Sequence, residues 1–364
     1  MLTSVRAARV IAPIAGLLLA AAVIASLGKH QARPTDNASP SSVRYSITDL
    51  GNDGGRFAVV GALSINNRGH VVCEALWIGG AGTFLWQKGK FTELGGPTVR
   101  ISPGRSLNDR GQVVGSYTAP DGRRETHVVI FRGGKMVDTG VLGHGLGIDE
   151  RGRVVGDAPH GRAFLYDRGR TIDLGGLGGA RTAAYQINVQ GQIAGASELA
   201  SGEPHAFLYS NGKMQDLGTL GGKRSLGTAI NSKGWIAGFS QRADGQDRAF
   251  LYRNGKLEEL GGSPDGEFPA PHAINATGSV VGESEPYHED GIAILWTGGR
   301  AYDLQDLIPP DSGWTLFDAT SINDRGQITV EGYRAGGRGV QSCVLTPVKN
   351  SGHGLAVDWW RRLF

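Results

Sequence analysis

The chain has 364 residues, and its 37 basic and 34 acidic residues leave a formal net charge of +3. This balance gives no overall basic field, so we expect no nucleic-acid partner. Glycine accounts for 59 residues and proline for only 15. Glycine is therefore well above its usual share of about 7%. Because the glycines recur at fixed offsets between short apolar runs, they indicate many tight turns rather than disorder.

The N-terminal segment differs from the rest of the chain. Arg6 and Arg9 precede the uncharged apolar run 10–27, "VIAPIAGLLLAAAVIASL". A basic start and an apolar run are typical of a secretory signal peptide, here with cleavage after Ala25. At 18 residues the run is also long enough to stay as a membrane anchor. Either alternative predicts export to the periplasm or the cell exterior, and the polar, Pro/Ser-rich residues 28–42 are expected to be a linker.

One short motif recurs along the chain. The pattern Ile-Asn-x-x-Gly, with small variations, begins at residues 65, 107, 148, 187, 230, 274 and 322. Successive copies are 42, 41, 39, 43, 44 and 48 residues apart. A period of about 40–45 residues is typical of the four-stranded blade of a β-propeller.

Four strands can be placed within one repeat. In 225–261, "SLGTAI" and "WIAGFS" flank the turn "NSKG", and "RAFLY" and "KLEEL" flank an Asn-Gly hairpin. The third strands, such as "FLW" at 84–86 and "FLY" at 250–252, are apolar on both faces. Such strands must be covered on both sides, as they are between stacked blades.

The two ends of the repeat region complement each other. The seventh unit stops after its third strand, near residue 346, and residues 45–50 resemble a fourth strand without a blade. Pairing the two would close the ring and remove its free edges. We therefore predict an all-β, monomeric, seven-bladed β-propeller over residues 43–347. An open solenoid or two packed sandwiches would leave the split unit unexplained.

The motif "HAFLYSNGKMQDLGTLGG…AINSKGWIAGFS" resembles the HAF-repeat family of extracellular bacterial repeat proteins. The resemblance covers roughly residues 43–346, although units one, two, six and seven depart from the His-Ala-Phe of the third strand. It implies export and a propeller-like fold. It implies no particular activity and no catalytic residues.

Non-repeated residues are the candidates for function. In such blades the second-to-third-strand loops and the blade-to-blade links lie on one face, where long variable loops such as 116–127, 240–248 and 283–291 are expected. The links carry basic or titratable residues without a matching acid in the same link. They are Arg56, Arg105, His144, Arg181, Arg224 and His272. These residues could form a binding site for an anionic ligand. They could also be solvated or pair with acids of neighbouring loops.

No catalytic motif or metal-binding spacing is present, and we expect no cofactor and no metal. The recurring Asn residues, and the Asp residues that precede Leu in the fourth strands, are interpreted as structural. The sequence favours an exported, non-catalytic binding scaffold. The alternatives are a periplasmic or extracellular hydrolase or lyase acting on carbohydrate or peptide, and a structural surface protein. A His–acid pair of perturbed pKa would favour an enzyme.

Two further features remain open. Cys73 and Cys343 fall in blades one and seven, which a closed ring brings together, so they could form a disulfide or stay as buried thiols. The tail 348–364 carries two Trp and two Arg residues near its end. It could contact a membrane interface or cover the end of a blade.

Overall fold

A computed structural model describes residues 45–51, 58–77, 80–95, 99–100, 106–118, 125–262, 268–285, 291–337 and 339–348. The apolar segment 10–27, the linker 28–42 and the tail beyond residue 348 lie outside these ranges, so the predictions made for them remain predictions. Among the described residues, no helix is long and apolar enough to cross a membrane.

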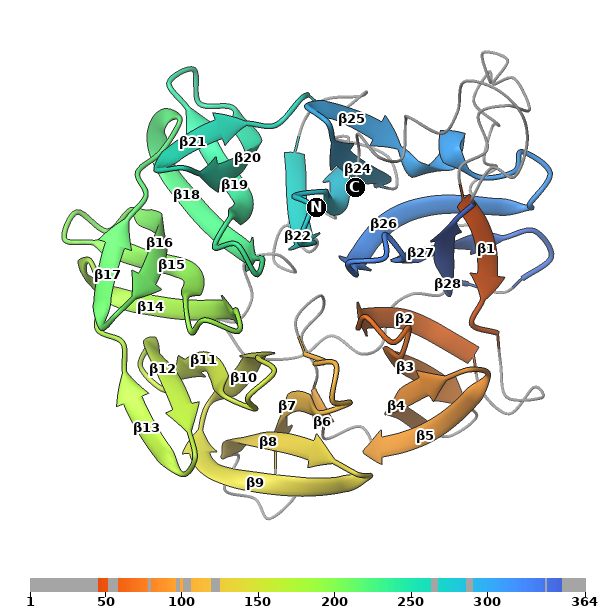
Figure 1. The fold of residues 1–364 in the computed structure, drawn as a ribbon, viewed down its shortest axis with the longest axis horizontal. Coiled ribbons are helices and arrows are strands. Elements are labelled where there is room, and N and C mark those ends of the chain that lie inside the picture. The colour runs from red at the N-terminus through yellow and green to blue at the C-terminus, as the bar shows by residue number, and fades with distance from the viewer. Residues whose placement is uncertain are drawn as a thin grey trace, which may run out of the picture.

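Seven four-stranded antiparallel sheets form a ring, with one sheet per repeat (Figure 1). We number the blades one to seven from β2 onward, so that the last blade contains β26, β27, β28 and β1. The innermost strands are β2 (Ala58–Ile65), β6 (Val99–Arg100), β10 (His144–Ile148), β14 (Gly178–Ile187), β18 (Gly221–Ile230), β22 (Phe268–Ile274) and β26 (Trp314–Ile322). The second strands are β3 (Val71–Trp77), β7 (Val113–Thr118), β11 (Val154–Ala158), β15 (Ile193–Leu199), β19 (Ile236–Arg242), β23 (Val280–Glu285) and β27 (Ile328–Arg334).

The outer half of each blade is a tight hairpin. The third strands are β4 (Gly80–Gln87), β8 (Thr126–Arg132), β12 (Arg162–Asp167), β16 (Pro204–Ser210), β20 (Asp247–Arg253), β24 (Ile292–Thr297) and β28 (Gln341–Pro347). The outermost strands are β5 (Lys90–Gly95), β9 (Lys135–Leu142), β13 (Arg170–Asp173), β17 (Lys213–Asp216), β21 (Lys256–Glu259), β25 (Arg300–Asp303) and β1 (Tyr45–Asp49). At the predicted Asn-Gly hairpin, Asn254 and Gly255 both have positive φ, 52° and 78°, as a type I′ turn requires.

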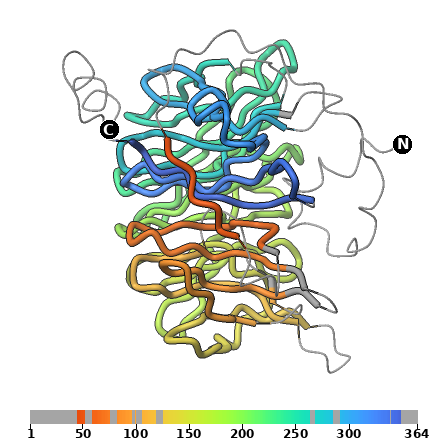
Figure 2. Tube along the Cα trace, turned by 90° about the vertical axis from the view of Figure 1, so that its right-hand side faces the viewer, coloured from red at the N-terminus to blue at the C-terminus, as the bar shows by residue number. Residues whose placement is uncertain are grey.

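The N-terminal strand closes the ring as predicted. β1 is antiparallel to β28, with Tyr45 opposite Pro347 and Asp49 opposite Cys343. In side view, β1 lies against the strands of the last blade (Figure 2). Tyr45 is 1% exposed and packs in the core cluster between blades six and seven, and Leu50 packs in the cluster between blades seven and one. The seven-bladed, all-β propeller is therefore confirmed.

The core consists of apolar layers between neighbouring blades. The described residues form one buried cluster at each of the seven blade interfaces. Successive residues of a third strand enter different layers: Phe250 packs between blades four and five, and Leu251 between blades five and six. Since side chains alternate across a strand, this confirms why the third strands are apolar on both faces.

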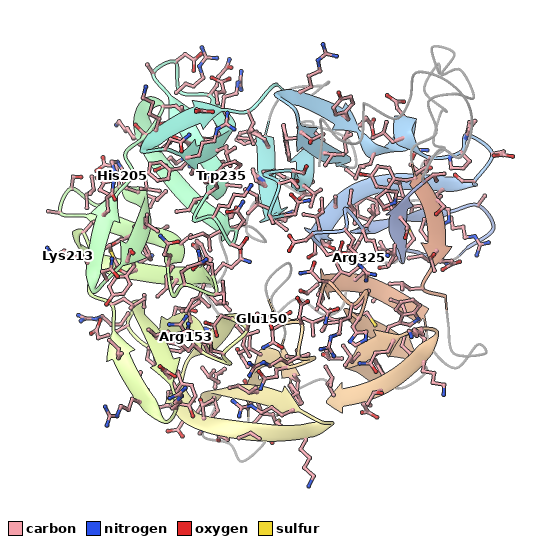
Figure 3. All side chains as sticks on the ribbon, viewed as in Figure 1. Glu150, Arg153, His205, Lys213, Trp235 and Arg325 are labelled. Carbon is pink, nitrogen blue, oxygen red and sulfur yellow. The ribbon has the colours of Figure 1, made fainter. Side chains whose placement is uncertain are left out.

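The recurring Asn residues link each blade to the next. The amide of Asn231 donates to the carbonyl oxygen of Asn275 in the following blade, at 3.0 Å, and the oxygen of the same amide accepts from the backbone N–H of Lys233 and Trp235. Equivalent inter-blade bonds leave Asn66, Asn108, Asn188, Asn275 and Asn323. At the remaining interface the residue is Asp149, whose side chain has no N–H, and the guanidinium of Arg153 donates to the carbonyl oxygen of Val189 instead. Figure 3 places Glu150 and Arg325, which belong to these turns, near the middle of the ring, and His205 and Lys213 farther out.

The disulfide suggested by the sequence is not formed. Cys73 and Cys343 are both buried free thiols. Cys73 lies in the layer between blades seven and one, but the residue that β28 sends into that layer is Val344. Cys343, one position earlier, points to the opposite layer, between blades six and seven. The two-residue alternation of the strand thus separates the two sulfur atoms. Burial raises the pKa of the Cys73 thiol to about 12, so it stays protonated at neutral pH.

Candidate functional site

The basic and titratable link residues that the structure describes are paired with acids. Arg56 and Arg105 lie outside the described ranges. Each of the other four has an acidic partner: His144 with Asp157, Arg181 with Glu198, Arg224 with Asp247, and His272 with both Glu283 and Asp318. These acids lie on innermost, second and third strands and not in the links themselves. The described cations therefore follow the alternative in which they pair with acids outside their own link.

These cations also lie at different levels along the inner strands. The level of each cation is given by the number of positions by which it precedes the repeated Asn or Asp of the same blade. This number is seven for Arg181 and Arg224, five for His144 and three for His272. In blades four and five, the residues that the sequence assigns to blade-to-blade links lie on inner strands, because β14 begins at Gly178 and β18 at Gly221. Side chains at such different levels do not form one ring around an anionic ligand.

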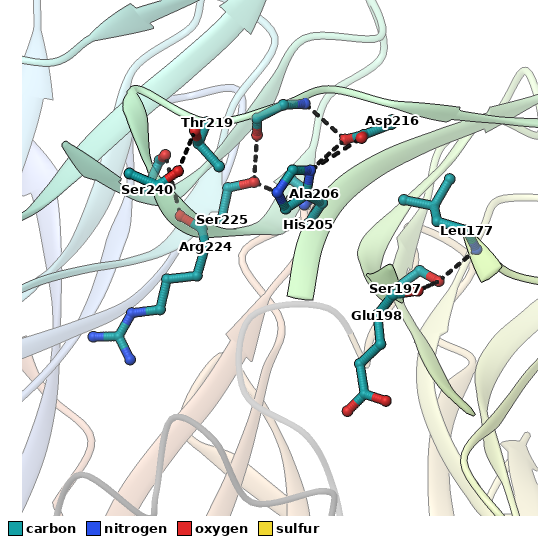
Figure 4. Close-up of polar contacts among 12 residues, drawn as sticks. Leu177, Ser197, Glu198, His205, Ala206, Asp216, Thr219, Arg224, Ser225 and Ser240 are labelled. Atoms are coloured by element: carbon teal, nitrogen blue, oxygen red, sulfur yellow. Dashed lines mark hydrogen bonds and ion pairs between the residues drawn. The ribbon is translucent and has the colours of Figure 1, made fainter. Parts of the chain in front are cut away.

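Polar residues at the link between blades four and five act as structural connectors (Figure 4). The hydroxyl of Ser225 donates to the carbonyl oxygen of Gly218 at 2.5 Å and accepts from the N–H of Ala206 at 2.9 Å. Asp216 accepts from the N–H of Gly218 and lies 2.9 Å from Nδ1 of His205. The His of the His-Ala-Phe motif therefore orients the acid that ends the fourth strand. This agrees with the structural role expected for that acid.

A bulge on the inner strand creates one variable position in six of the blades, and the corresponding position of blade two lies outside the described residues. The strand register is interrupted at the residue that lies three positions before the repeated Asn or Asp. The side chain of this residue therefore does not follow the regular alternation of the strand. The bulged residues are Leu63, Leu146, Tyr185, Thr228, His272 and Thr320. Two of them reach the following blade directly, since Thr228 donates to the carbonyl oxygen of Pro271 and Thr320 to that of Ala62. His272 is the member of this set that carries an imidazole.

His272 meets two carboxylates at the boundary of blades six and seven. Its Nε2 atom is 3.3 Å from Oδ1 of Asp318 on β26 and 3.8 Å from Oε1 of Glu283 on β23. The side chains are 16–19% exposed. Among the described residues, these three form the one group of His, Cys, Asp and Glu side chains whose geometry could hold a metal ion. Sequence reasoning singled out His272, included Glu283 only as the first residue of the variable loop 283–291, and missed Asp318. The three residues come from three strands of two blades and have no linear spacing.

The electrostatics of this cluster are unusual. Burial alone would lower the pKa of His272, but the carboxylates of Asp318 and Glu283 outweigh it and raise the pKa to about 10. The imidazole is therefore a cation at neutral pH. At His144, hydrogen bonding to Asp157 also raises the pKa, but this pair involves one carboxylate and a more exposed imidazole.

The His272 cluster predicts a stability that depends on pH. Since the pKa is raised on folding from 6.5 to about 10, the stabilisation is fully present below pH 6.5 and is lost as pH rises toward 10. We expect wild type to lose on the order of a few kcal/mol of unfolding free energy across this range relative to His272→Gln. Urea unfolding of both proteins at several pH values measures the difference. Parallel pH profiles would contradict the assignment.

In blades four and five, the inner positions equivalent to His144 and Asp157 hold apolar residues. Ala183 with Ala196 and Leu226 with Phe239 occupy the paired positions that hold His144 and Asp157 in blade three. With Leu146 and Tyr185 they form one buried cluster along blades three to five. The inner strands therefore have an apolar sector and a separate sector, in blades six and seven, that contains the His272 cluster.

These features define a class of protein: a seven-bladed propeller, closed by its N-terminal strand, with a polar cluster on its inner strands. No family model and no curated protein matches the chain. It is similar to the β-propeller domain of the trilobed protease from Pyrococcus furiosus, with 9% identity and a TM-score of 0.53 over 82% of this chain and 100% of that one.

Two other solved structures share the fold. An acylaminoacyl peptidase from Pyrococcus horikoshii is 9% identical, with a TM-score of 0.51 over 85% of this chain and 54% of that one. A chain of the mitotic checkpoint complex is 9% identical, with a TM-score of 0.50 over 91% of this chain and 100% of that one. Propellers from a protease and from a checkpoint complex are thus equally similar to this chain. The likeness establishes the fold alone.

Proposed function

We propose that this chain is an exported propeller that binds a ligand or partner, with the site centred on His272, Glu283 and Asp318. The observation that carries the proposal is the meeting of these three polar side chains, from three strands of two neighbouring blades, within 4.8 Å of one another. Polar residues that converge from separate strands are the usual composition of a binding site. The export signal and the place in the HAF-repeat family belong to the same proposal.

An enzyme is the second candidate, because a His–acid cluster with a strongly shifted pKa is a known mark of catalytic sites. The direction of the shift does not suit a general base. A general base must be neutral near the working pH, and a pKa of about 10 keeps His272 protonated there. The preference for an anionic ligand is not part of the proposal, since the four described cations that suggested it are paired with acids.

A thermal-shift screen of the full chain tests this function. Four classes of ligand are screened, all in the presence of a chelator: sugars, organic acids, nucleotides and short peptides. We expect at least one class to raise the melting temperature of wild type, because a ligand that binds only the folded state stabilises it. The shift should be absent in Glu283→Gln and Asp318→Asn and retained in Asp157→Asn, which changes the similar pair of blade three. No shift with any class, or a shift that survives both site variants, would count against the proposal.

A further inference from the structure

We infer that His272, Glu283 and Asp318 bind a divalent transition-metal ion, and that Zn²⁺ is the ion their donor atoms suit best. The inference rests on the proposed function, because it names a ligand of the same site. It goes beyond that function in assigning the site a chemistry that the linear sequence does not reveal.

The donor atoms have the spacing of a metal site. One imidazole nitrogen and two carboxylate oxygens lie within 4.8 Å of one another. The distances from Nε2 of His272 to the oxygens of Asp318 and Glu283 are 3.3 Å and 3.8 Å. Donors bound tetrahedrally at about 2.1 Å from zinc are roughly 3.4 Å apart, so only small rotations of the side chains are required. A mixed nitrogen and oxygen set suits zinc and its first-row neighbours better than magnesium or calcium.

Two of the donor atoms lack the hydrogen bond that a simple ion pair would provide. Nε2 of His272 and Oδ1 of Asp318 are both buried, and neither has a hydrogen-bond partner although they face each other. Buried polar atoms normally have partners, and exceptions call for an explanation. A metal ion between the two atoms would satisfy both at once, and its binding would displace the proton that Nε2 of His272 carries in the metal-free protein.

The backbone positions these ligands firmly. The bulge between Pro271 and Ala273 turns His272 toward the next blade, as it does at the equivalent threonines. Gly291 lets the chain pass close to the acid of β23, because a Cβ there would lie 3.1 Å from Oε2 of Glu283 and 3.0 Å from the carbonyl oxygen of Phe317. All three ligands stand on strands, which hold a site more precisely than loops do.

Zinc titration of the untagged full-length chain tests the inference. The protein is stripped with chelator, dialysed and titrated with Zn²⁺ by calorimetry, and Co²⁺ serves as a spectroscopic probe. We expect one ion per chain, with d–d absorption from Co²⁺ that one equivalent of Zn²⁺ removes. Glu283→Gln and Asp318→Asn should weaken binding by about tenfold or more. Asp157→Asn is the matched control and should bind as wild type does.

The contrary results are equally specific. The inference is overturned if wild type binds no stoichiometric Zn²⁺, or if both carboxylate variants bind it unchanged. If either variant fails to fold, as judged by circular dichroism, the Co²⁺ spectrum of wild type decides: no d–d absorption from one bound ion ends the proposal. A ligand found in the chelator-containing screen and lost in Glu283→Gln would support the proposed function even where zinc fails, so the two failures can be told apart.

Discussion

Removing residues 45–50 from the full-length chain is expected to unfold the propeller or make it self-associate. Blade seven would lose its outer strand, and the long edge of β28 would be exposed to pairing with other chains. The deletion would remove Tyr45 from one core layer and Leu50 from another. Truncating a buried side chain of this size lowers the free energy of unfolding by about 2–5 kcal/mol. A domain of ordinary stability has only about 5–15 kcal/mol in total. Size-exclusion chromatography with light scattering and thermal unfolding measure the effect.

The control for this deletion is Ser46→Ala, which changes an exposed residue of the same strand and should leave the melting temperature nearly unchanged. A synthetic peptide of residues 43–51 provides a stricter check. Added to the truncated chain, it should pair with β28 and restore the monomer, as in other cases of strand addition. A truncated chain that stays monomeric with the wild-type melting temperature would contradict the closure by β1.

Asn231→Ala is expected to be strongly destabilising. The side chain is 4% exposed, accepts from the N–H groups of Lys233 and Trp235 and donates to the carbonyl oxygen of Asn275. Its loss leaves buried polar groups without partners in its own turn and in the next blade. We expect the free energy of unfolding to fall by about 2–4 kcal/mol. Chemical denaturation at neutral pH gives this value directly.

Ser232→Ala is the matched control, since Ser232 is exposed in the same turn. It should change stability by less than about 0.5 kcal/mol. Equal effects of the two substitutions would show that the inter-blade bond contributes nothing. A large effect of Asn231→Ala alone would support the chain of Asn side chains as the link that holds blades together.

Only one of the three site residues could be selected from the sequence. His272 could be chosen because it interrupts a repeat, and a residue that departs from a repeated pattern stands out in one dimension. Glu283 and Asp318 could not be found in this way. Acids also occupy the position of Glu283 in blades one, three and seven, as Glu74, Asp157 and Glu331, so the type of residue alone does not single it out. Only register and blade contact show which acids face His272.

The alternatives that the sequence left open for the cysteines and the basic residues have the same origin. The sequence places Cys73 and Cys343 in adjacent blades, but a shift of one residue along β28 decides which layer a side chain enters. The six basic link residues looked alike in sequence, yet the described ones lie at different levels, and each has an acid from another strand beside it.

The sequence by itself determined the number of blades, the strands within each blade, the turns and the closure by residues 45–50. These features depend on local chemistry repeated at a constant period, and each repeat confirms the others. Only the tertiary structure decided which side chains of different blades meet, because such contacts depend on bulges and on register across separate strands. The cluster of His272, Glu283 and Asp318 is of this second kind: its donor atoms lie within 4.8 Å in space but on three strands of two blades.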